Sequence, residues 1–150
     1  MTGEAVAGPL TGKRLRWIPT EVTTWGEWRA RHPATTVLAP PREPRAYEMD
    51  PYGRYRETDA LSFPLGPVRV PRGRRYKDPV TIVPRPGGAR CYPHDALREG
   101  VTQDGSLRIV RRGRNVTVED ADGTPVPSMQ AYWFAFFAAH PGGTVFGEGG

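Results

Sequence analysis

A cysteine and a histidine three residues apart, Cys91 and His94, form the part of the sequence best suited to chemistry. A thiolate and an imidazole at this spacing could share one soft metal ion, or the imidazole could lower the pKa of the thiol and prepare a nucleophile. Two ligands do not complete a zinc site, so His32, His140 or a second chain would have to supply the rest. The alternative is a buried cysteine that packs as a small apolar residue beside a surface histidine.

Cys91 is the single cysteine among the 150 residues, which excludes an intramolecular disulfide and a dithiol redox pair within this sequence. Motifs typical of phosphate-binding loops, dinucleotide-binding turns, zinc proteases and serine hydrolases are absent. We therefore expect a non-catalytic binding or assembly module and predict no cofactor. The alternative is a thiol- or metal-dependent redox enzyme centred on Cys91 and His94, with a metal ion held there.

Positive charge suggests a second alternative, nucleic-acid binding. The sequence has 21 Lys and Arg against 16 Asp and Glu, for a net charge of +5, and 19 of the basic residues are arginine. Two clusters stand out: Arg69, Arg72, Arg74, Arg75 and Lys77 in one, and Arg108, Arg111, Arg112 and Arg114 in the other. With Tyr76 they could grip phosphates and stack a base. Solvent-exposed charge and the arginine bias of a GC-rich genome explain the same basic clusters, so nucleic-acid binding is not the favoured function.

Residues 39–78 are expected to form a long irregular excursion, because prolines and charges recur through them. Loops of this length are often functional. We expect this one to bind another polypeptide or a second copy of the chain. The residues predicted to make the contact are aromatic or basic: Tyr47, Tyr52, Tyr55, Arg72, Arg74, Arg75 and Tyr76.

Two short helices are predicted, one near each end of the sequence. Thr24 followed by Glu27 is a capping-box signature, and Pro33 prevents the helix from continuing. Near the other end an apolar segment runs from Met129 to Ala139 and stops at a second His-Pro pair. Ser128 is the N-cap that the sequence predicts for this second helix.

The two segments, residues 18–38 and 126–146, align without a gap at an offset of 108 residues, with seven of 21 positions identical. We interpret them as an internal duplication whose copies pack against each other; convergent helix-stop sequences are the alternative. His32 and His140 are expected to be structural, since each ends a helix. The aromatic residues of the two helices are expected to be core residues: Trp25, Trp28, Trp133 and Phe136.

The expected fold is a single α+β domain over residues 1–150, rich in strands and loops, with two pseudo-equivalent short helices. Residues 80–83 read as a strand, residues 107–112 and 115–119 as a hairpin, and residues 147–150 as a frayed tail. Glycine and proline, 18 and 17 residues, preclude long helices.

No apolar run is long enough to insert into a membrane, and no secretion signal is visible. We expect a cytoplasmic location, or an extracytoplasmic one if the N-terminus is truncated.

Several short motifs resemble a prokaryotic domain-of-unknown-function family whose members are often labelled "(seleno)protein". The motifs are Gly8-Pro9-Leu10, Trp25-Gly26-Glu27-Trp28, His32-Pro33, Asp50-Pro51-Tyr52, Tyr92-Pro93, Tyr132-Trp133 and His140-Pro141. Longer members carry an additional N-terminal half with a Cys-Pro-Leu-Cys-like segment, which suggests redox chemistry. Nothing here matches that segment, and Cys91 stands where the family pattern has a small residue. The resemblance therefore implies a C-terminal half that exposes a face complementary to the other half.

Overall fold

The computed structural model describes residues 3–39, 50, 52–62, 65–66 and 68–148. They form two compact units, a larger one of Met1–Val22 with Leu65–Gly150 and a smaller one of Thr23–Pro64. Within the described residues there are three α-helices and seven strands in two sheets. The predicted α+β class is confirmed.

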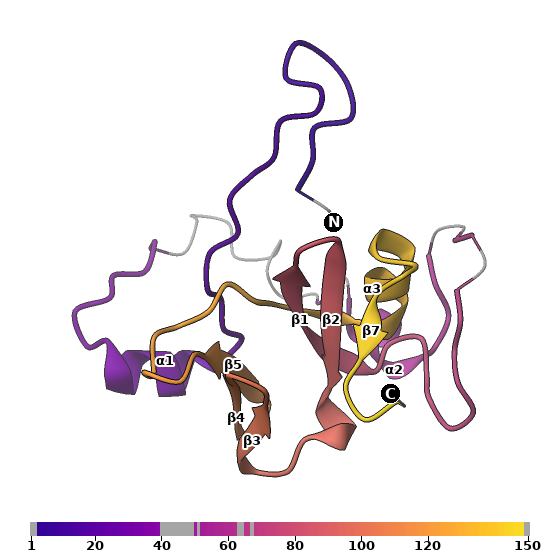
Figure 1. Ribbon diagram of the computed structural model, residues 1–150. Helices are drawn as coiled ribbons and strands as arrows, with labels where there is room; N and C mark the ends of the chain where they lie inside the picture. Colours follow the sequence, from indigo (N-terminus) through magenta and orange to yellow (C-terminus); the bar gives the residue numbers. More distant parts are fainter. Residues whose placement is uncertain (1–2, 40–49, 51, 63–64, 67, 149–150) are drawn as a thin grey trace. The chain divides into compact units, whose positions relative to one another are not determined.

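The first sheet of the larger unit has the order β6-β1-β2-β7 (Figure 1). Its centre is an antiparallel hairpin of β1 (Pro79–Arg85) and β2 (Gly88–Pro93). The turn between them contains Pro86 and Gly87, and Gly87 has a φ of +78° that a side chain would strain. β6 (Met129–Tyr132) runs antiparallel to β1, whereas β7 (Thr144–Val145) runs parallel to β2.

The second sheet consists of β3 (Gly100–Asp104), β4 (Leu107–Arg112) and β5 (Asn115–Glu119), each antiparallel to the next. The predicted hairpin is confirmed, because Asn115 pairs with Arg112 across a turn in which Gly113 has a φ of +59°. A short 3-10 helix, η2 (His94–Ala96), connects the two sheets between β2 and β3.

Side-chain alternation along β1 and β2 divides the core into two clusters. One face carries Ile82 and Cys91 against α3 (Trp133–Ala139), where Trp133 and Phe136 are fully buried. The opposite face carries Val83 and Tyr92 against the second sheet, whose buried residues are Leu107, Ile109, Val116 and Val118. The β1–β2 hairpin is thus covered on both faces.

The smaller unit contains α1 (Trp25–Arg31) and α2 (Gly53–Glu57). The predicted capping box at α1 is confirmed: the Glu27 amide donates to Thr24 Oγ1 at 3.2 Å, and the Thr24 amide donates to Glu27 Oε2 at 3.0 Å. Neither helix contains a buried residue. α2 lies inside the predicted excursion, of which residues 40–49, 51, 63–64 and 67 are outside the described part.

The predicted N-cap of the second helix is wrong. α3 begins at Trp133 with Tyr132 as its N-cap, and Ser128 is a buried residue before β6. Residues 129–132 are extended because they pair with β1, where Met129 opposes Ile82. Backbone pairing with a distant strand therefore overrides the local capping signal.

The two helices nevertheless correspond closely in local geometry. Each has seven residues, and α3 begins and ends 108 positions after α1. The C-cap residue His32 has φ −130° and ψ 67°, while His140 has φ −136° and ψ 68°. The amide of each histidine donates to the carbonyl four residues earlier, on Trp28 and Phe136. The shared sequence pattern thus gives the same helix and the same stop.

Candidate functional site

Cys91 is fully buried in the cluster between β1, β2 and α3. Burial penalises the thiolate, which raises the pKa of Cys91 to about 12 although Arg74 partly opposes the effect. A thiol with this pKa stays protonated at neutral pH, and the thiolate is the form that attacks or binds metal. The structure therefore gives Cys91 the environment of a core residue.

His94 is buried too, but through a different set of contacts. Its Nε2 and the Thr81 hydroxyl are hydrogen-bonded at 2.9 Å, and its carbonyl accepts a hydrogen bond from Arg111 Nη1 at 2.5 Å. Burial and then the Arg111 charge lower the pKa of His94 to about 4. The imidazole is neutral at physiological pH and serves as a buried hydrogen-bonding group.

Cys91 and His94 lie on opposite sides of the first sheet. Cys91 opposes Ile82, and both side chains belong to the α3 cluster. Thr81 precedes Ile82 on β1, so its side chain points to the other face, where it binds His94. The structure does not bring the two predicted ligands together. No group of three or more His, Cys, Asp or Glu side chains in the described parts of the chain is arranged to hold a metal.

The other two histidines pack against aromatic rings. The His32 ring packs on the Trp28 ring in a tilted arrangement, with centroids 4.0 Å apart. His140 lies 6.5 Å from the Trp17 ring and 5.8 Å from the Phe136 ring, and burial lowers its pKa. Its Nε2 is buried without a hydrogen-bond partner. Each of these two histidines is the C-cap residue of its helix. Among the described residues, neither forms a metal-binding group with Cys91.

The predicted partner-binding residues separate into two environments. Arg74 has a side chain only 14% exposed, stacked 4.7 Å above the Trp133 ring and paired with Asp95 at 2.6 Å. It therefore fixes η2 and α3 rather than facing a ligand. The remaining residues are accessible to different degrees: Arg72, Arg75 and Tyr52 are exposed, Tyr55 and Tyr76 are half-buried, and Tyr47 lies outside the described residues.

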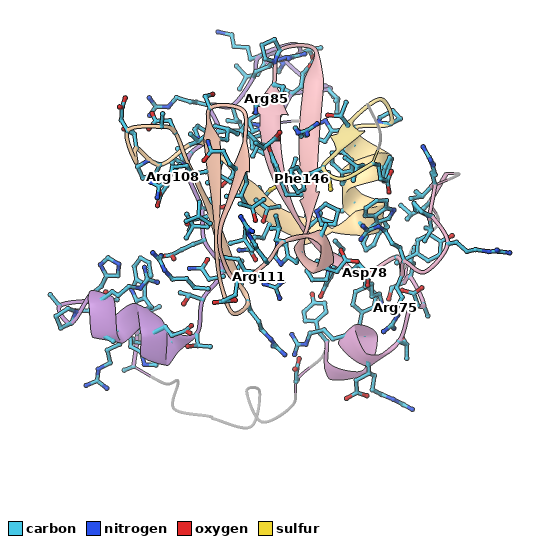
Figure 2. All side chains as sticks on the ribbon, turned by 60° about the horizontal axis from the view of Figure 1, so that its bottom comes forward. Arg75, Asp78, Arg85, Arg108, Arg111 and Phe146 are labelled. Atoms are coloured by element: carbon cyan, nitrogen blue, oxygen red, sulfur yellow. The ribbon has the colours of Figure 1, made fainter. Side chains whose placement is uncertain are left out.

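Two basic residues of the β4–β5 hairpin, Arg108 and Arg111, have partners within the chain; both are labelled in Figure 2. Arg108 pairs with Glu119 across the hairpin at 3.1 Å. Arg111 donates to the carbonyls of His94 and Leu97 at 2.5 and 2.7 Å. These two guanidinium groups bind carboxylate and carbonyl oxygens of their own chain, whereas Arg112 and Arg114 are exposed.

Sequence reasoning missed one polar network, formed by Arg90, Tyr92 and Asp104. Arg90 contacts both carboxylate oxygens of Asp104, at 2.5 and 3.2 Å, and the Tyr92 hydroxyl donates to the same carboxylate at 2.6 Å. Partial burial opposes ionisation of Asp104, but hydrogen bonds from Tyr92 and Arg90 hold its pKa below the usual range. Burial and the same carboxylate raise the pKa of Tyr92 to about 12. The alternation Arg-x-Tyr in β2 was the available signal.

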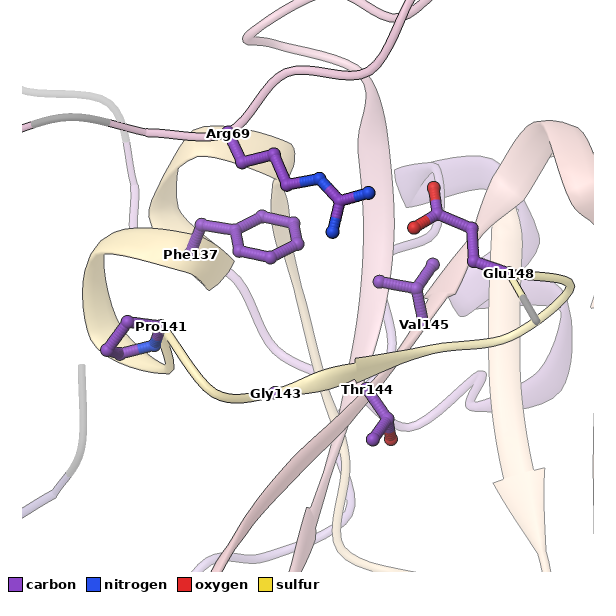
Figure 3. Close-up of a pocket in the computed structure, with 7 residues that line it drawn as sticks. All are labelled: Arg69, Phe137, Pro141, Gly143, Thr144, Val145 and Glu148. Atoms are coloured by element: carbon purple, nitrogen blue, oxygen red, sulfur yellow. The ribbon is translucent and has the colours of Figure 1, made fainter. Parts of the chain in front are cut away.

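An open pocket of about 420 Å³ adjoins α3 and β7. Arg69 and Glu148 point toward one another from its two sides, and Phe137 and Val145 form its apolar wall (Figure 3). The pocket thus offers ionic contacts of both signs. Of the side chains singled out from the sequence for chemistry, Arg69 lines it, whereas Cys91 and His94 do not.

The largest contrast in exposure concerns the segment around α1, residues 24–38, which we call the α1 segment. Trp25 is 49% exposed, Val37 67% and Leu38 94%. Their counterparts 108 positions later are Trp133, fully buried, Val145, 7% exposed, and the half-buried Phe146. The α1 segment thus leaves in solvent the positions that the α3 segment uses for packing.

A comparison with protein families places residues 1–106 in a family described as protein of unknown function (DUF3179). No curated protein and no solved structure matches the sequence. No helix in the parts of the chain described above is long and apolar enough to cross a bilayer. The family description names no activity.

Proposed function

We propose, from the premise that this chain belongs to the family described as protein of unknown function (DUF3179), that it is a non-catalytic binding or assembly module. The observation that carries the proposal is the exposure of three large apolar side chains in the α1 segment, Trp25, Val37 and Leu38. Exposed groups of large apolar side chains are typical of interaction sites. The expected partner is another polypeptide or a second copy of the chain.

An internal duplication is part of this proposal. Its support is the correspondence of α1 and α3 at an offset of 108 residues and their equal C-cap geometry. After each helix the same turn follows, since the Thr35 amide donates to the His32 carbonyl and the Gly143 amide to the His140 carbonyl. Two copies of one packing unit should bury equivalent faces. The copy that contains α1 leaves Trp25, Val37 and Leu38 exposed, and this difference supports a binding partner.

We further propose that the module is one half of a split redox-type protein of the kind labelled "(seleno)protein", with the reactive thiol on the other half. Burial of Cys91 supports this division, because its pKa of about 12 leaves no thiolate at neutral pH. The opposite placement of Cys91 and His94 gives the enzymatic alternative no support. The internal partners of Arg108 and Arg111 leave Arg112 and Arg114 as the exposed basic groups of the hairpin, and these two alone give little support to nucleic-acid binding.

Native mass spectrometry of the protein purified from its source tests the proposal. The wild type should carry a stoichiometric second polypeptide or a second copy. The double variant Trp25→Ser/Trp28→Ser should lose it, since the two indoles are the largest apolar groups of the α1 segment. Leu10→Ser is the matched control, because Leu10 is 60% exposed outside that segment. A wild type that is monomeric at native concentration and indistinguishable from the double variant contradicts the proposal.

A further inference from the structure

We infer that the pocket beside α3 and β7 binds a small zwitterion, namely a free amino acid with an apolar or aromatic side chain. The pocket has a volume of about 420 Å³, and sites for small molecules are typically roughly 300–1,000 Å³. All of its lining residues belong to the larger unit. None of them belongs to the α1 segment, so the inference is independent of the proposed function.

The two charged groups of the pocket face each other without pairing. Figure 3 shows the Arg69 guanidinium and the Glu148 carboxylate pointing toward one another from opposite sides. Within the described part of the chain, the Arg69 guanidinium forms no ion pair or hydrogen bond. The Glu148 carboxylate has Arg74 Nε at 4.0 Å, which is longer than a hydrogen bond. Both groups can therefore take a ligand group of opposite charge.

The backbone that carries each charge is anchored to the core of the larger unit. Trp133 Nε1 donates to the carbonyl of Arg69 at 2.8 Å, which ties that residue to α3. The Glu148 amide donates to the Val145 carbonyl at 3.4 Å, in the turn that follows β7. A ligand that bridges the two charges would therefore not have to order the backbone around them.

The apolar wall of the pocket is formed before any ligand binds. The half-buried Phe137 ring packs edge-on against Phe136 with centroids 4.8 Å apart, and it lies 5.0 Å from the Trp133 ring. Val145, which is 7% exposed, pairs with Cys91 in the first sheet. An apolar ligand side chain placed against Phe137 and Val145 would leave water, which favours binding.

The two charges select among classes of ligand. A ligand with only a negative charge would meet Glu148, and one with only a positive charge would meet Arg69, so each would be repelled at one side. A free amino acid brings an ammonium group to Glu148 and a carboxylate to Arg69, whose guanidinium can bind both carboxylate oxygens. Its side chain is then available for the apolar wall. Charge and polarity together therefore match a zwitterion with an apolar side chain.

The test is an NMR titration of the complete chain with L-phenylalanine. Binding with a Kd on the order of 1 mM is expected for a ligand of this size, with chemical-shift changes at residues 137 and 141–148. Three further probes each lack one contact: N-acetyl-L-phenylalanine lacks the ammonium, L-phenylalanine amide lacks the carboxylate, and glycine lacks the side chain. Each should bind about tenfold more weakly than L-phenylalanine.

Two variants should change the preference for charge in opposite directions. Arg69→Gln should weaken L-phenylalanine binding by about tenfold and strengthen binding of the amide. Glu148→Gln should weaken L-phenylalanine binding as well, but it should strengthen binding of the N-acetyl compound. Arg72→Gln and Asp122→Asn are the matched controls, because both residues are exposed and neither lines the pocket. The controls should bind all four probes as the wild type does.

Three outcomes would overturn the inference. The first is no binding of L-phenylalanine to the wild type at about 10 mM, tenfold above the expected Kd, which would indicate that Arg69 and Glu148 pair with each other. The second is equal affinity for the zwitterion and its two singly charged derivatives. The third is the same change of preference in both pocket variants. The Trp25→Ser/Trp28→Ser variant should bind L-phenylalanine normally, so the proposed function and this inference fail separately.

Discussion

The hydroxyl of Thr20 donates a hydrogen bond of 2.8 Å to the carbonyl of Ser128, its counterpart 108 residues later. Pro19 and Ser128 also form a parallel backbone bridge. Both segments belong to the larger unit, so the entries to the two helical segments lie side by side there. Ser128, which the sequence assigned to a helix cap, is instead a buried backbone acceptor at this junction.

Thr20→Val tests the importance of this junction. The substitution keeps the shape of the side chain and removes the donor, so the Ser128 carbonyl loses a partner. The free energy of unfolding should fall by about 1 kcal/mol, as measured by urea denaturation. Thr11→Val is the control, because the Thr11 hydroxyl binds the exposed Gly8 carbonyl within its own turn. Equal losses in the two variants would contradict a special role for the junction.

His94 should make stability depend on pH below neutrality. Its pKa is lowered from 6.5 to about 4 in the folded state, so the unfolded chain binds more protons between these values. Stability is then fully present above pH 6.5 and falls as the pH decreases toward 4, by at most about 3 kcal/mol from this group.

Denaturation of wild type and His94→Gln from pH 8 to 4 checks this prediction. Glutamine cannot titrate, so the variant should lose most of the slope between pH 6.5 and 4. A smaller slope should remain, because burial also lowers the pKa of His140. Identical slopes in wild type and variant would show that His94 is not the titrating group.

Cys91 should not react in the folded protein. Because burial raises the pKa of the thiol to about 12, alkylation by iodoacetamide at pH 8 should proceed only through unfolding. Reaction in denaturant should be immediate, and mass spectrometry after timed quenching measures both rates. Rapid labelling under native conditions would contradict the buried position and revive the thiol-dependent alternative.

Tyr92 and Asp104 should be coupled through their hydrogen bond. Tyr92→Phe leaves one oxygen of a partly buried carboxylate without its 2.6 Å donor, so the free energy of unfolding should fall by about 1–2 kcal/mol. In an Asp104→Asn background the same substitution should cost less, and a double-mutant cycle measures the difference. Additive effects would indicate that the two groups act independently.

Gly143 should tolerate no side chain. A Cβ there would lie 2.3 Å from Phe136 Cζ, whereas a Cβ at the adjacent Gly142 would meet nothing within 4 Å. Gly143→Ala should therefore destabilise the protein by about 1–3 kcal/mol through displacement of a buried ring. Gly142→Ala, the matched control, should have little effect on thermal unfolding. Similar melting temperatures for both variants would contradict the packing of Phe136.

The partners of the buried polar groups could not be predicted from the sequence. The Arg-x-Tyr alternation in β2 places Arg90 and Tyr92 on one face, but their shared acceptor Asp104 is on another strand of the other sheet. Cys91 and His94 are close in sequence, and their spacing alone predicts a pair. Strand alternation and the turn into η2 direct their side chains to opposite faces.

Short sequence patterns predict those features whose interactions join residues close together in the sequence. The capping box of Thr24 and Glu27, the two His-Pro stops, the strand at Val80–Val83 and the Gly113 hairpin all follow from residues within a few positions of one another. These features, with the α+β class, are what the sequence by itself determined. Backbone hydrogen bonds within a turn of chain require no distant partner.

Tertiary structure alone decided which surfaces are covered. The same helix pattern is buried at Trp133 and exposed at Trp25; α3 packs on the β1–β2 hairpin of its own unit, whereas the described residues of the smaller unit contain no strand. Residues 129–132, which the sequence predicts as helix, form strand β6 because they pair with β1. Burial depends on contacts between segments far apart in sequence, which local residue patterns do not specify.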